Sequence, residues 1–505
     1  MRRRTFLQTS AAALCGAMAQ QTNAAQRPNI LFAISDDQSW PHAGAYGSRM
    51  VNTPAFDWVA REGCLFSNVF ASAPQCSPNR ASILTGRPIW SLEEAGTHSS
   101  YFPQKWTVFP DLLEQAGYAI GYTGKAWGPG NWQDAGRTRN PVGNQFSKRR
   151  MDSSPEGING LDYAGNFEDF INQKPDDDPF FFWYGASEPH RSYKRGIGEE
   201  SGKKLSDADV PPFLPDNGVI RGDLLDYAVE VEWFDSHLMR MLNLLKERGE
   251  LDNTMIIVTS DNGMPFPGAK ATLYEYGIHM PFAVRWPAGM KGNRKIKDFV
   301  SFIDLAPTML EAAGVKAHKD MMGASFLDVL TSNQSGQVDP DRDQIVAGRE
   351  RHSHSRFDNW AYPARCIRKN NWLYIRNFKS DRVLAGDPPG YHDIDDSPSK
   401  SYLLEHRDEA HIQPLFEHSY GKNPPEQLFD VQRDPGCLNN LADQPQLAAT
   451  KNQLWSELLQ QLEKGNDPRV KGYGHLFESY PRFGGMRPEL GGFAERGVYN
   501  KNYQR

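Results

Sequence analysis

The segment from Ala73 to Arg87, APQCSPNRASILTGR, holds a cysteine and an arginine at a spacing that suits anion chemistry. Cys76 and Arg80 are four residues apart, and the sequence up to Gly86 is compatible with a helix, so both side chains would share one face near its first turn. A helix N-terminus offers unpaired N–H groups and the positive end of its dipole, and an arginine adds a permanent charge. The segment therefore predicts a site for a tetrahedral oxyanion. The alternative interpretation is a small buried cysteine beside a surface arginine.

Two pairs of oxygen-bearing side chains follow runs that are typical of buried strands. Asp36 and Asp37 come after RPNILFAIS, and Asp261 and Asn262 come after TMIIVTS. These residues offer only oxygen ligands, which suit a hard cation such as calcium or magnesium far better than zinc. A single pair of this kind is more often a solvated loop or a helix cap. Two pairs, each after a buried strand, indicate a metal site.

The elements that must position these residues alternate between strand and helix. Strands are predicted at 65–73, 119–125, 179–190 and 254–260, and helices at 53–63, 109–118, 166–173 and 223–248. This alternation predicts an α/β fold in which helices sandwich a large, mostly parallel β-sheet. Ligands of such sheets bind beyond the carboxyl ends of the strands. We therefore expect the two acidic pairs, Lys125 and the segment 188–190 to converge.

Length and composition bound the remaining possibilities. The chain has 505 residues, 39% hydrophobic and 23% charged residues and a net charge of −6, which is typical of a soluble globular protein and gives no basic field for nucleic acid.

Consecutive arginines, a short apolar run and small residues in 1–26 predict a twin-arginine export signal, and hence a periplasmic or secreted protein with no membrane span in the mature form. Two domains are expected, at 27–360 and at 361–505, the second being a smaller α+β unit with a wrapping tail. The four cysteines beyond the signal are too few and too scattered to predict a disulfide.

The motif C-x-P-x-R followed by LTG, formed by Cys76, Pro78 and Arg80, resembles that of the formylglycine-dependent type I sulfatases of the alkaline phosphatase superfamily. The resemblance implies an alkaline phosphatase-like fold. It also implies that a formylglycine-generating maturation enzyme oxidises Cys76 to formylglycine, whose hydrated aldehyde is the nucleophile. One calcium ion is implied, and the residues at matching positions would bind it together with the group at position 76: Asp36, Asp37, Asp261 and Asn262.

Further motifs extend the resemblance to charged residues of the site. Lys125 in GYTGKAWGPG and Lys270 in GAKATLYEYG match two family lysines, which implies that both bind the sulfate. His190 in SEPHRSY matches the active-site histidine of the family, which implies a general acid assisted by Lys270. The chain departs from the family pattern at two positions. Asn79 stands where a small residue such as serine is usual, and Trp127 stands where many sulfatases carry a histidine.

Three segments narrow the resemblance to the N-sulfoglucosamine sulfohydrolase branch: SDNGMPFPGAKATLY, EPHRSY and LFDVQRDPGCLNNLA. The implied partner is a sulfated oligo- or polysaccharide, with N-sulfate and O-sulfate both open. The residues predicted to contact it lie in loops that approach the sugar in this branch or beside the predicted histidine: His98, Arg191, Tyr193, His352, His354 and Arg365.

Two other functions are compatible with the same pocket. Phosphate-ester hydrolases of the wider superfamily hold two softer metals with several histidines and often show Asp-His at the place of Asp261 and Asn262, so Asn262 argues against this alternative. The second alternative function is that of a non-catalytic protein that binds sulfated glycans, and Asn79 and Trp127 favour it. The sequence as a whole predicts an enzyme that hydrolyses sulfate groups of a carbohydrate.

Overall fold

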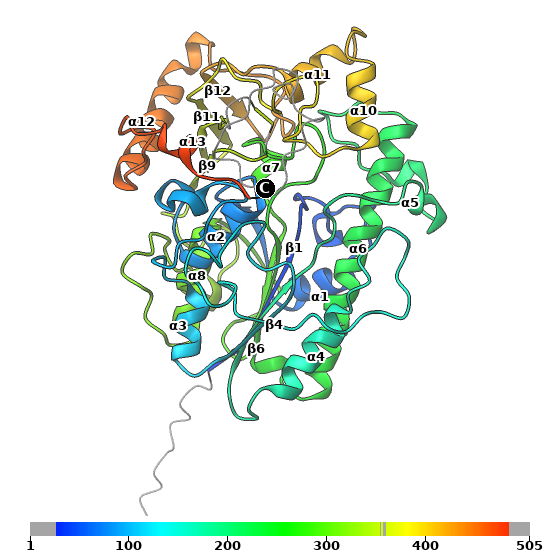
Figure 1. Ribbon diagram of the computed structural model, residues 1–505, viewed down its shortest axis with the longest axis vertical. Coiled ribbons are helices and arrows are strands. Elements are labelled where there is room, and N and C mark those ends of the chain that lie inside the picture. The colour runs from blue at the N-terminus through cyan, green and yellow to red at the C-terminus, as the bar shows by residue number, and fades with distance from the viewer. Residues whose placement is uncertain (1–26, 354, 357–359, 484–505) are drawn as a thin grey trace, which may run out of the picture.

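The computed structural model describes residues 27–353, 355–356 and 360–483, so the predicted export signal at 1–26 lies outside the described residues. A large twisted sheet with helices on both sides forms the body of the molecule, and a smaller sheet lies above it (Figure 1). The predicted α/β fold with a mostly parallel sheet is confirmed.

The large sheet has eight strands in the order β4-β3-β5-β1-β6-β7-β2-β8. Strand β7 runs antiparallel to β6 and β2, and the other neighbouring pairs are parallel. Four of the strands that precede predicted site residues, β3, β5, β1 and β6, are consecutive neighbours, so their carboxyl ends open onto one edge. The strands are β1 (Asn29–Ser35), β2 (Cys64–Phe70), β3 (Ala119–Gly124), β4 (Asn144–Gln145), β5 (Phe180–Gly185), β6 (Thr254–Ser260), β7 (Phe282–Arg285) and β8 (Arg294–Ser301).

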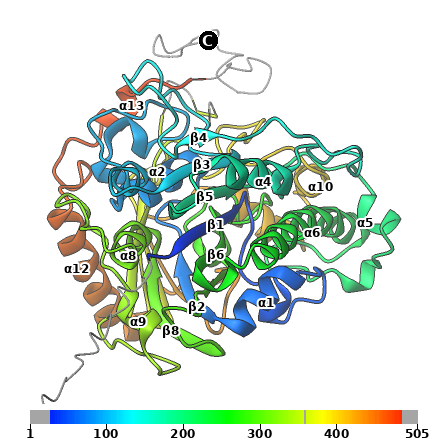
Figure 2. The same ribbon diagram turned by 90° about the horizontal axis from the view of Figure 1, so that it is seen from below.

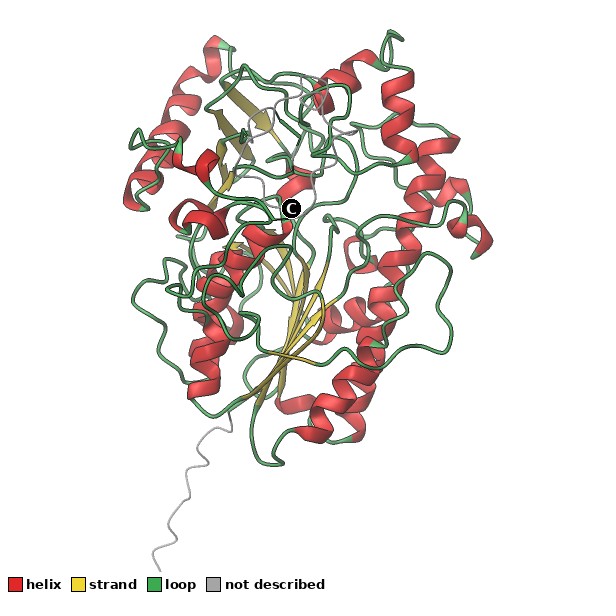
Figure 3. Ribbon diagram, in the orientation of Figure 1, coloured by secondary structure: helices red, strands yellow, loops and turns green. Residues whose placement is uncertain are grey.

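Side chains of β1 alternate between the two hydrophobic cores of the molecule. Ile30, Phe32 and Ile34 belong to the core under helices α2, α3 and α8, whereas Leu31 and Ala33 belong to the core under α1, α4 and α6. Successive side chains of a strand point to opposite faces, so an unbroken apolar run is what a strand covered on both sides requires. The two helical layers on either side of the sheet are clear from below and in the view coloured by secondary structure (Figures 2 and 3).

The four helices predicted from periodicity and capping residues are present as α1, α3, α4 and α6. The longest, α6, begins after the cap Asn217, whose side chain accepts hydrogen bonds from the N–H groups of Val219 and Ile220. The helices are α1 (Pro54–Glu62), α2 (Cys76–Thr85), α3 (Phe109–Gln115), α4 (Tyr163–Gln173), α5 (Ile197–Glu200), α6 (Gly218–Glu247), α7 (Glu275–Ile278), α8 (Leu305–Ala312), α9 (Leu327–Thr331), α10 (Pro398–Glu405), α11 (Gln413–Tyr420), α12 (Ala448–Lys464) and α13 (Leu476–Ser479).

A four-stranded antiparallel sheet forms the core of the C-terminal part. Its order is β12-β11-β10-β9, with β9 (Gln344–Arg349), β10 (Ala364–Lys369), β11 (Trp372–Asn377) and β12 (Glu426–Asp430). Because β9 pairs with β10, the chain enters the small sheet at β9, and the division into two domains at residue 360 stays a prediction. The end of the described chain returns to the first part of the molecule, where the N–H of Phe483 donates to the carbonyl of Ser99 at 2.7 Å.

Within the described ranges, every helix is too short or too polar to cross a membrane. The four cysteines of these ranges, Cys64, Cys76, Cys366 and Cys437, are buried and free.

Candidate active site

Cys76 opens helix α2, as its motif predicted. The preceding Gln75 is extended, and the helix ends at Gly86, whose φ of 62° is a left-handed conformation that glycine adopts readily. The Cys76 side chain is only 1% exposed. Because α2 follows strand β2, the positive end of the helix is held against the carboxyl edge of the sheet.

Asp37 lies at the centre of the residues that the loops bring together. Its Oδ1 accepts a hydrogen bond from Asn262 Nδ2 at 2.5 Å and lies 4.0 Å from Cys76 Sγ. Its Oδ2 pairs with Lys270 Nζ and lies 3.7 Å from His190 Nε2. Residues that follow β1, β2, β5 and β6 therefore meet around one carboxylate, as the expected convergence of strand ends requires.

The buried Arg80 side chain connects Asp261 to the loop that carries Lys125. Its side chain is fully buried, and Nε donates to Asp261 Oδ2 at 2.8 Å. Nη1 donates to the carbonyls of Lys125 and Ala126 at 2.6 and 3.0 Å, which fixes the loop after β3. The Lys125 side chain in turn pairs with Asp36. Arg80 therefore positions both an acidic residue and the lysine loop.

The charges of the site stabilise one another. Burial opposes ionisation of Asp36, but the neighbouring positive charges, chiefly that of Lys125, together lower the pKa of this carboxyl. Burial likewise opposes the charge of Lys270, but the neighbouring acidic groups, chiefly Asp37, together raise the pKa of Lys270 well above its usual value. Burial and Asp36 raise the pKa of the Cys76 thiol well above its usual range, so the protein itself keeps this thiol protonated.

The donor set fits a hard cation. One carboxylate oxygen each from Asp36, Asp37 and Asp261 lie within 4.8 Å of one another, and all three side chains are buried. Asp36 Oδ1 and Asn262 Oδ1 are also buried and have no hydrogen-bond partner among the described residues. Buried oxygens without donors are costly, and a cation with oxygen ligands would satisfy them. An all-oxygen set of this kind suits calcium.

Asn79, the first departure from the family pattern, has a defined structural role. Its Oδ1 accepts hydrogen bonds from the Ser72 N–H and hydroxyl at 3.0 and 3.1 Å, and its Nδ2 donates to the carbonyl of Asp261. The side chain is fully buried. Asn79 thus ties the end of β2 to the loop that carries Asp261, a connection that the sequence does not reveal.

Replacing Asn79 with alanine is expected to lower the free energy of unfolding by about 3 kcal/mol, because it leaves buried polar groups without partners. Urea unfolding of the purified variant measures this loss. Asn243→Ala, at an exposed position of α6, is the matched control and should change stability by no more than about 0.5 kcal/mol. A loss below about 1 kcal/mol for Asn79→Ala would show that these hydrogen bonds do not hold the loop.

Trp127, the second departure, packs beneath the segment that carries Cys76. Its Nε1 donates to the carbonyl of Ser77 at 3.0 Å, and its ring meets Phe102 edge-on with centroids 5.0 Å apart. The side chain is 3% exposed. Trp127 therefore supports the first turn of α2 and offers no titratable group.

Of the predicted substrate contacts, His98 and His352 lie side by side, with ring centroids 4.4 Å apart. Both are largely buried, and burial lowers the pKa of His352 to about 3 and that of His98 well below its usual value. Positive charge from Lys270 contributes to both shifts, so the pair stays neutral beside the charged site. His354 lies outside the described residues.

Arg191 and Tyr193 lie next to the site but have protein partners. The Arg191 guanidinium forms a bidentate pair with Asp223 at 2.7 and 2.8 Å. It also lies over the rings of Tyr193 and Phe266, each centroid 4.5 Å away. Its charge is therefore neutralised, and its role in this arrangement is to hold the loop that carries His190.

The structure corrects the placement expected for Arg365. Its side chain is fully buried and pairs with Asp467 at 2.7 Å and with Glu350 at 2.8 Å. Its guanidinium also lies 5.4 Å from the Trp90 ring centroid. Arg365 therefore joins β10 to the segment after α12 and is not accessible to a substrate.

Asp395 belongs to the site but was not predicted. Its Oδ2 lies 3.7 Å from Lys270 Nζ, and one ligand atom each of Asp395, Asp37 and His190 fall within 4.8 Å of one another. Burial opposes its ionisation, but Lys270 and His190 lower its pKa. In the sequence it stands in the acidic run HDIDDS, which looks like a solvated loop and carries no sign of a strand end.

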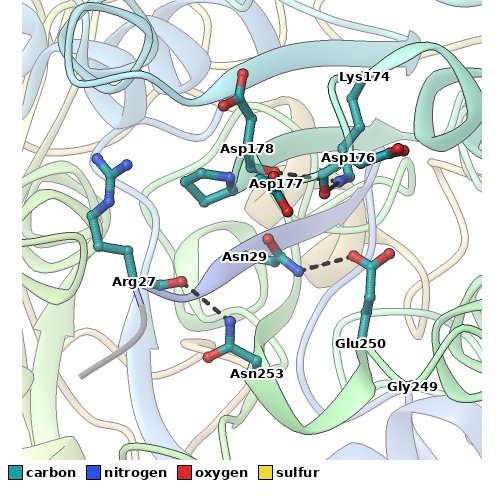
Figure 4. A pocket seen from close by; sticks show the side chains of 10 residues that line it. Arg27, Asn29, Lys174, Asp176, Asp177, Asp178, Gly249, Glu250 and Asn253 are labelled. Atoms are coloured by element: carbon teal, nitrogen blue, oxygen red, sulfur yellow. Dashed lines mark hydrogen bonds between the residues drawn. The ribbon is translucent and has the colours of Figure 1, made fainter. Parts of the chain in front are cut away.

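A cavity of about 540 Å³ adjoins the site, and its lining includes Asp36, Lys125, His190, Glu188 and Glu230. Tyr163 donates to Glu188 Oε2 at 2.8 Å, and burial raises the pKa of Glu188 to about 7. Another hollow, of about 340 Å³, lies at the opposite, amino ends of the strands beside Asn29 and Glu250, and it contains none of the predicted site residues (Figure 4). The predicted site residues Asp36, Lys125 and His190 therefore line the cavity of about 540 Å³ and not the second hollow.

Glu230 gives the protein a measurable pH dependence. Burial, Glu188 and Asp226 raise the pKa of Glu230 from 4.5 to about 9, so the folded protein binds this proton more tightly than the unfolded chain does. The stabilisation is complete below pH 4.5 and is lost as the pH rises toward about 9. The melting temperature of the wild type should therefore fall relative to that of Glu230→Gln between pH 5 and pH 9. Parallel curves for the two proteins would contradict this prediction.

The fold and the site define the class of protein. Residues 28–315, more than half of the chain, match the model of the sulfatase family, and the chain belongs to this family. It is similar to an ulvan-active sulfatase of Formosa agariphila, with 28% identity over 451 residues that cover 88% of this chain and 81% of the relative. It is also similar to human N-sulphoglucosamine sulphohydrolase, with 28% identity over 476 residues that cover 88% and 91% of the two chains.

A solved structure shows the same fold. BT4656 in complex with D-glucosamine-2-N,6-O-disulfate matches with a TM-score of 0.64 and 21% identity, over 88% of this chain and 100% of that chain. The predicted resemblance to carbohydrate sulfatases is confirmed, and the chain is a sulfatase.

Proposed function

We propose that this sulfatase removes sulfate groups from a sulfated oligo- or polysaccharide, with a formylglycine at position 76 and one bound calcium ion. The observation that carries the proposal is the meeting of Cys76, three buried carboxylates and two lysines at the carboxyl edge of the sheet. The names of the relatives support a sugar substrate, since they act on ulvan and on N-sulphoglucosamine.

Asp36, Asp37, Asp261 and Asn262 would hold the calcium ion, together with the group at position 76. When bound, calcium offsets negative charge on the sulfate, and the hydrated formylglycine supplies an oxygen nucleophile. Arg80 contributes by fixing Asp261 at 2.8 Å and by holding the Lys125 loop in place. The protonated thiol of unmodified Cys76 is a weak nucleophile, which is consistent with a need for the modification.

Lys125 and Lys270 act on the transferred sulfuryl group. Both stay protonated, because Asp36 raises the pKa of Lys125 and Asp37 that of Lys270 against the effect of burial. Two ammonium groups on the same edge of the sheet would offset charge that builds on the sulfuryl oxygens. Asp395, 3.7 Å from Lys270, would keep that ammonium group oriented.

His190 is the proposed general acid. Its Nδ1 lies 2.7 Å from the carbonyl of Arg191, which can only accept, so Nδ1 carries a hydrogen. Nε2 is then the atom that faces the site, 3.7 Å from Asp37 Oδ2. A proton held there would pass to the departing oxygen or nitrogen of the sugar. With about one third of its side chain exposed, His190 is accessible to a substrate.

The proposal includes a maturation enzyme that converts Cys76 to formylglycine, and export through the twin-arginine signal at 1–26 to the periplasm or the medium. His98 and His352, whose ring centroids lie 4.4 Å apart, are the proposed sugar contacts. N-sulfate and O-sulfate substrates are both included.

The proposal is tested with protein produced together with a formylglycine-generating enzyme. Release of sulfate from a panel of defined sulfated oligosaccharides is then measured. Matched sulfate and phosphate monoesters should be turned over with a clear preference for sulfate. Faster turnover of the phosphate esters would favour the phosphate-ester hydrolase. Tight binding of sulfated sugars without release, unchanged by Cys76→Ala, would favour the non-catalytic glycan-binding protein.

A further inference from the structure

Two of the four charged side chains that meet around Asp37 reach the surface of the site. Asp395 is 31% exposed and His190 is 34% exposed, whereas Asp37 and Lys270 are buried. One ligand atom each of Asp37, His190 and Asp395 lie within 4.8 Å of one another. A group that approaches His190, the proposed general acid, therefore comes within reach of the Asp395 carboxylate.

The chain on both sides of Asp395 is held by groups that pair with one another. Asp393, two residues earlier, is buried and pairs with two arginines at 2.7 and 2.6 Å. Lys400 Nζ donates to the carbonyl of Ile394 and to Asp396 Oδ1, each at 2.9 Å. These contacts fix the backbone before and after Asp395. Its carboxylate is therefore held in place before a substrate arrives.

The two oxygens of Asp395 have different surroundings. Oδ2 is buried, lies 3.7 Å from Lys270 Nζ and accepts no hydrogen bond from the described residues. Because Oδ2 is covered while a third of the side chain is exposed, Oδ1 is the oxygen that a ligand can reach. Burial opposes ionisation, but neighbouring positive groups, chiefly Lys270, together lower the pKa of this carboxyl. An ionised carboxylate can only accept hydrogen bonds.

The donor that meets this oxygen is set by the position of His190. The departing oxygen or nitrogen of the sugar must lie at His190 Nε2, the atom that faces the site. In a sugar, the free hydroxyl and amino groups closest to the departing atom are those on neighbouring carbons. Such a group stands beside His190 when the sulfate is in place, and Asp395 is the carboxylate next to His190 there.

We propose that Asp395 determines which sugars the enzyme accepts, because its Oδ1 accepts a hydrogen bond from a free hydroxyl or amino group beside the sulfate that is removed. The inference rests on the proposed function for the sugar substrate and for the role of His190. A sugar that lacks this group leaves a charged acceptor without its donor and is a poorer substrate. This contact is distinct from the effect of Asp395 on Lys270.

Methyl glucosaminides with one sulfate at N2, O3 or O6 first identify the position that the wild type cleaves. Analogues of that sugar that lack each free hydroxyl or amino group, one at a time, then measure what each group contributes. For at least one group beside the sulfate, removal should lower the wild-type kcat/KM at least about tenfold, as expected for a hydrogen bond to a charged acceptor. In Asp395→Ala the same removal should change kcat/KM by less than about threefold.

The comparison of parent sugar and analogue isolates the contact. Asp395→Ala also removes a charge beside Lys270, but that effect is shared by both sugars and cancels in their ratio. Asp395→Asn, which keeps the shape of the side chain, should also lower the ratio. Asp396→Ala, at the exposed neighbouring carboxylate, is the matched control and should keep the wild-type ratio. The inference is overturned if no group reaches threefold in the wild type, or if the wild-type ratio persists in folded Asp395 variants.

Two further measurements separate this inference from the proposed function. Turnover of 4-nitrophenyl sulfate reports the sulfatase chemistry without a sugar, and its absence would count against the proposed function. A wild type that hydrolyses this ester but none of the glucosaminides would overturn the inference alone. Saturating calcium should raise the melting temperature of Asp395→Asn as it does that of the wild type. Loss of this response would make Asp395 a metal ligand, which would also overturn the inference.

Discussion

Replacing Cys76 with alanine is expected to lower kcat for sulfate release by at least about 10⁴-fold, the scale of loss seen when a covalent nucleophile is removed. The residue is small and opens α2, so the variant should fold and should still bind sulfated sugar. Steady-state kinetics with a defined sulfated oligosaccharide, together with thermal unfolding, measures both effects.

Cys64→Ala is the matched control for this variant. Cys64 is also a fully buried cysteine, but it lies at the start of β2, away from the acidic cluster. Removal of the Cys64 sulfur should lower the stability of the protein by creating a small cavity. It should leave kcat within a few-fold of the wild-type value. A Cys76→Ala enzyme with more than about one tenth of the wild-type kcat would show that the nucleophile lies elsewhere.

Asp261→Asn is expected to have the second large effect, on both metal binding and stability. The change removes one of the three clustered carboxylates and leaves buried Arg80 without its partner at 2.8 Å. Breaking a buried ion pair in this way costs about 3 to 5 kcal/mol. For the wild type, calcium at about 100 times its dissociation constant should add about 2.7 kcal/mol to the free energy of unfolding after treatment with a chelator.

Thermal unfolding with and without added calcium checks this second prediction. The melting temperature of the wild type should rise with calcium, and that of Asp261→Asn should not. Asp341→Asn, an exposed carboxylate outside the cluster, should respond to calcium as the wild type does. A calcium response of normal size in Asp261→Asn would exclude this residue as a ligand.

Local patterns along the chain were sufficient to predict the centre of the site. Asp36-Asp37 and Asp261-Asn262 each follow an apolar run, and runs of that kind become neighbouring parallel strands whose ends meet. The motif around Cys76 carries its own helix start and its glycine end. These inferences depend on short stretches of sequence, and the structure places the residues together.

The periphery of the site depends on pairing between distant segments, which a single sequence does not display. Arg365 and Arg191 look available in the sequence, but Asp467 and Asp223 neutralise them. Asp395 enters from a loop of the C-terminal part and reaches Lys270 across more than a hundred residues. The same limit applies to the start of the small sheet, since β9 is recognised only by its pairing with β10.

The proposed nucleophile is tested most directly by mass spectrometry of the peptide that carries Cys76, from enzyme produced together with a formylglycine-generating enzyme and shown to be active. Conversion of the thiol side chain to an aldehyde lowers the mass by about 18 Da, and we expect this shift in a fraction of the peptide that tracks specific activity. An unmodified thiol at position 76 in a fully active preparation would contradict the account.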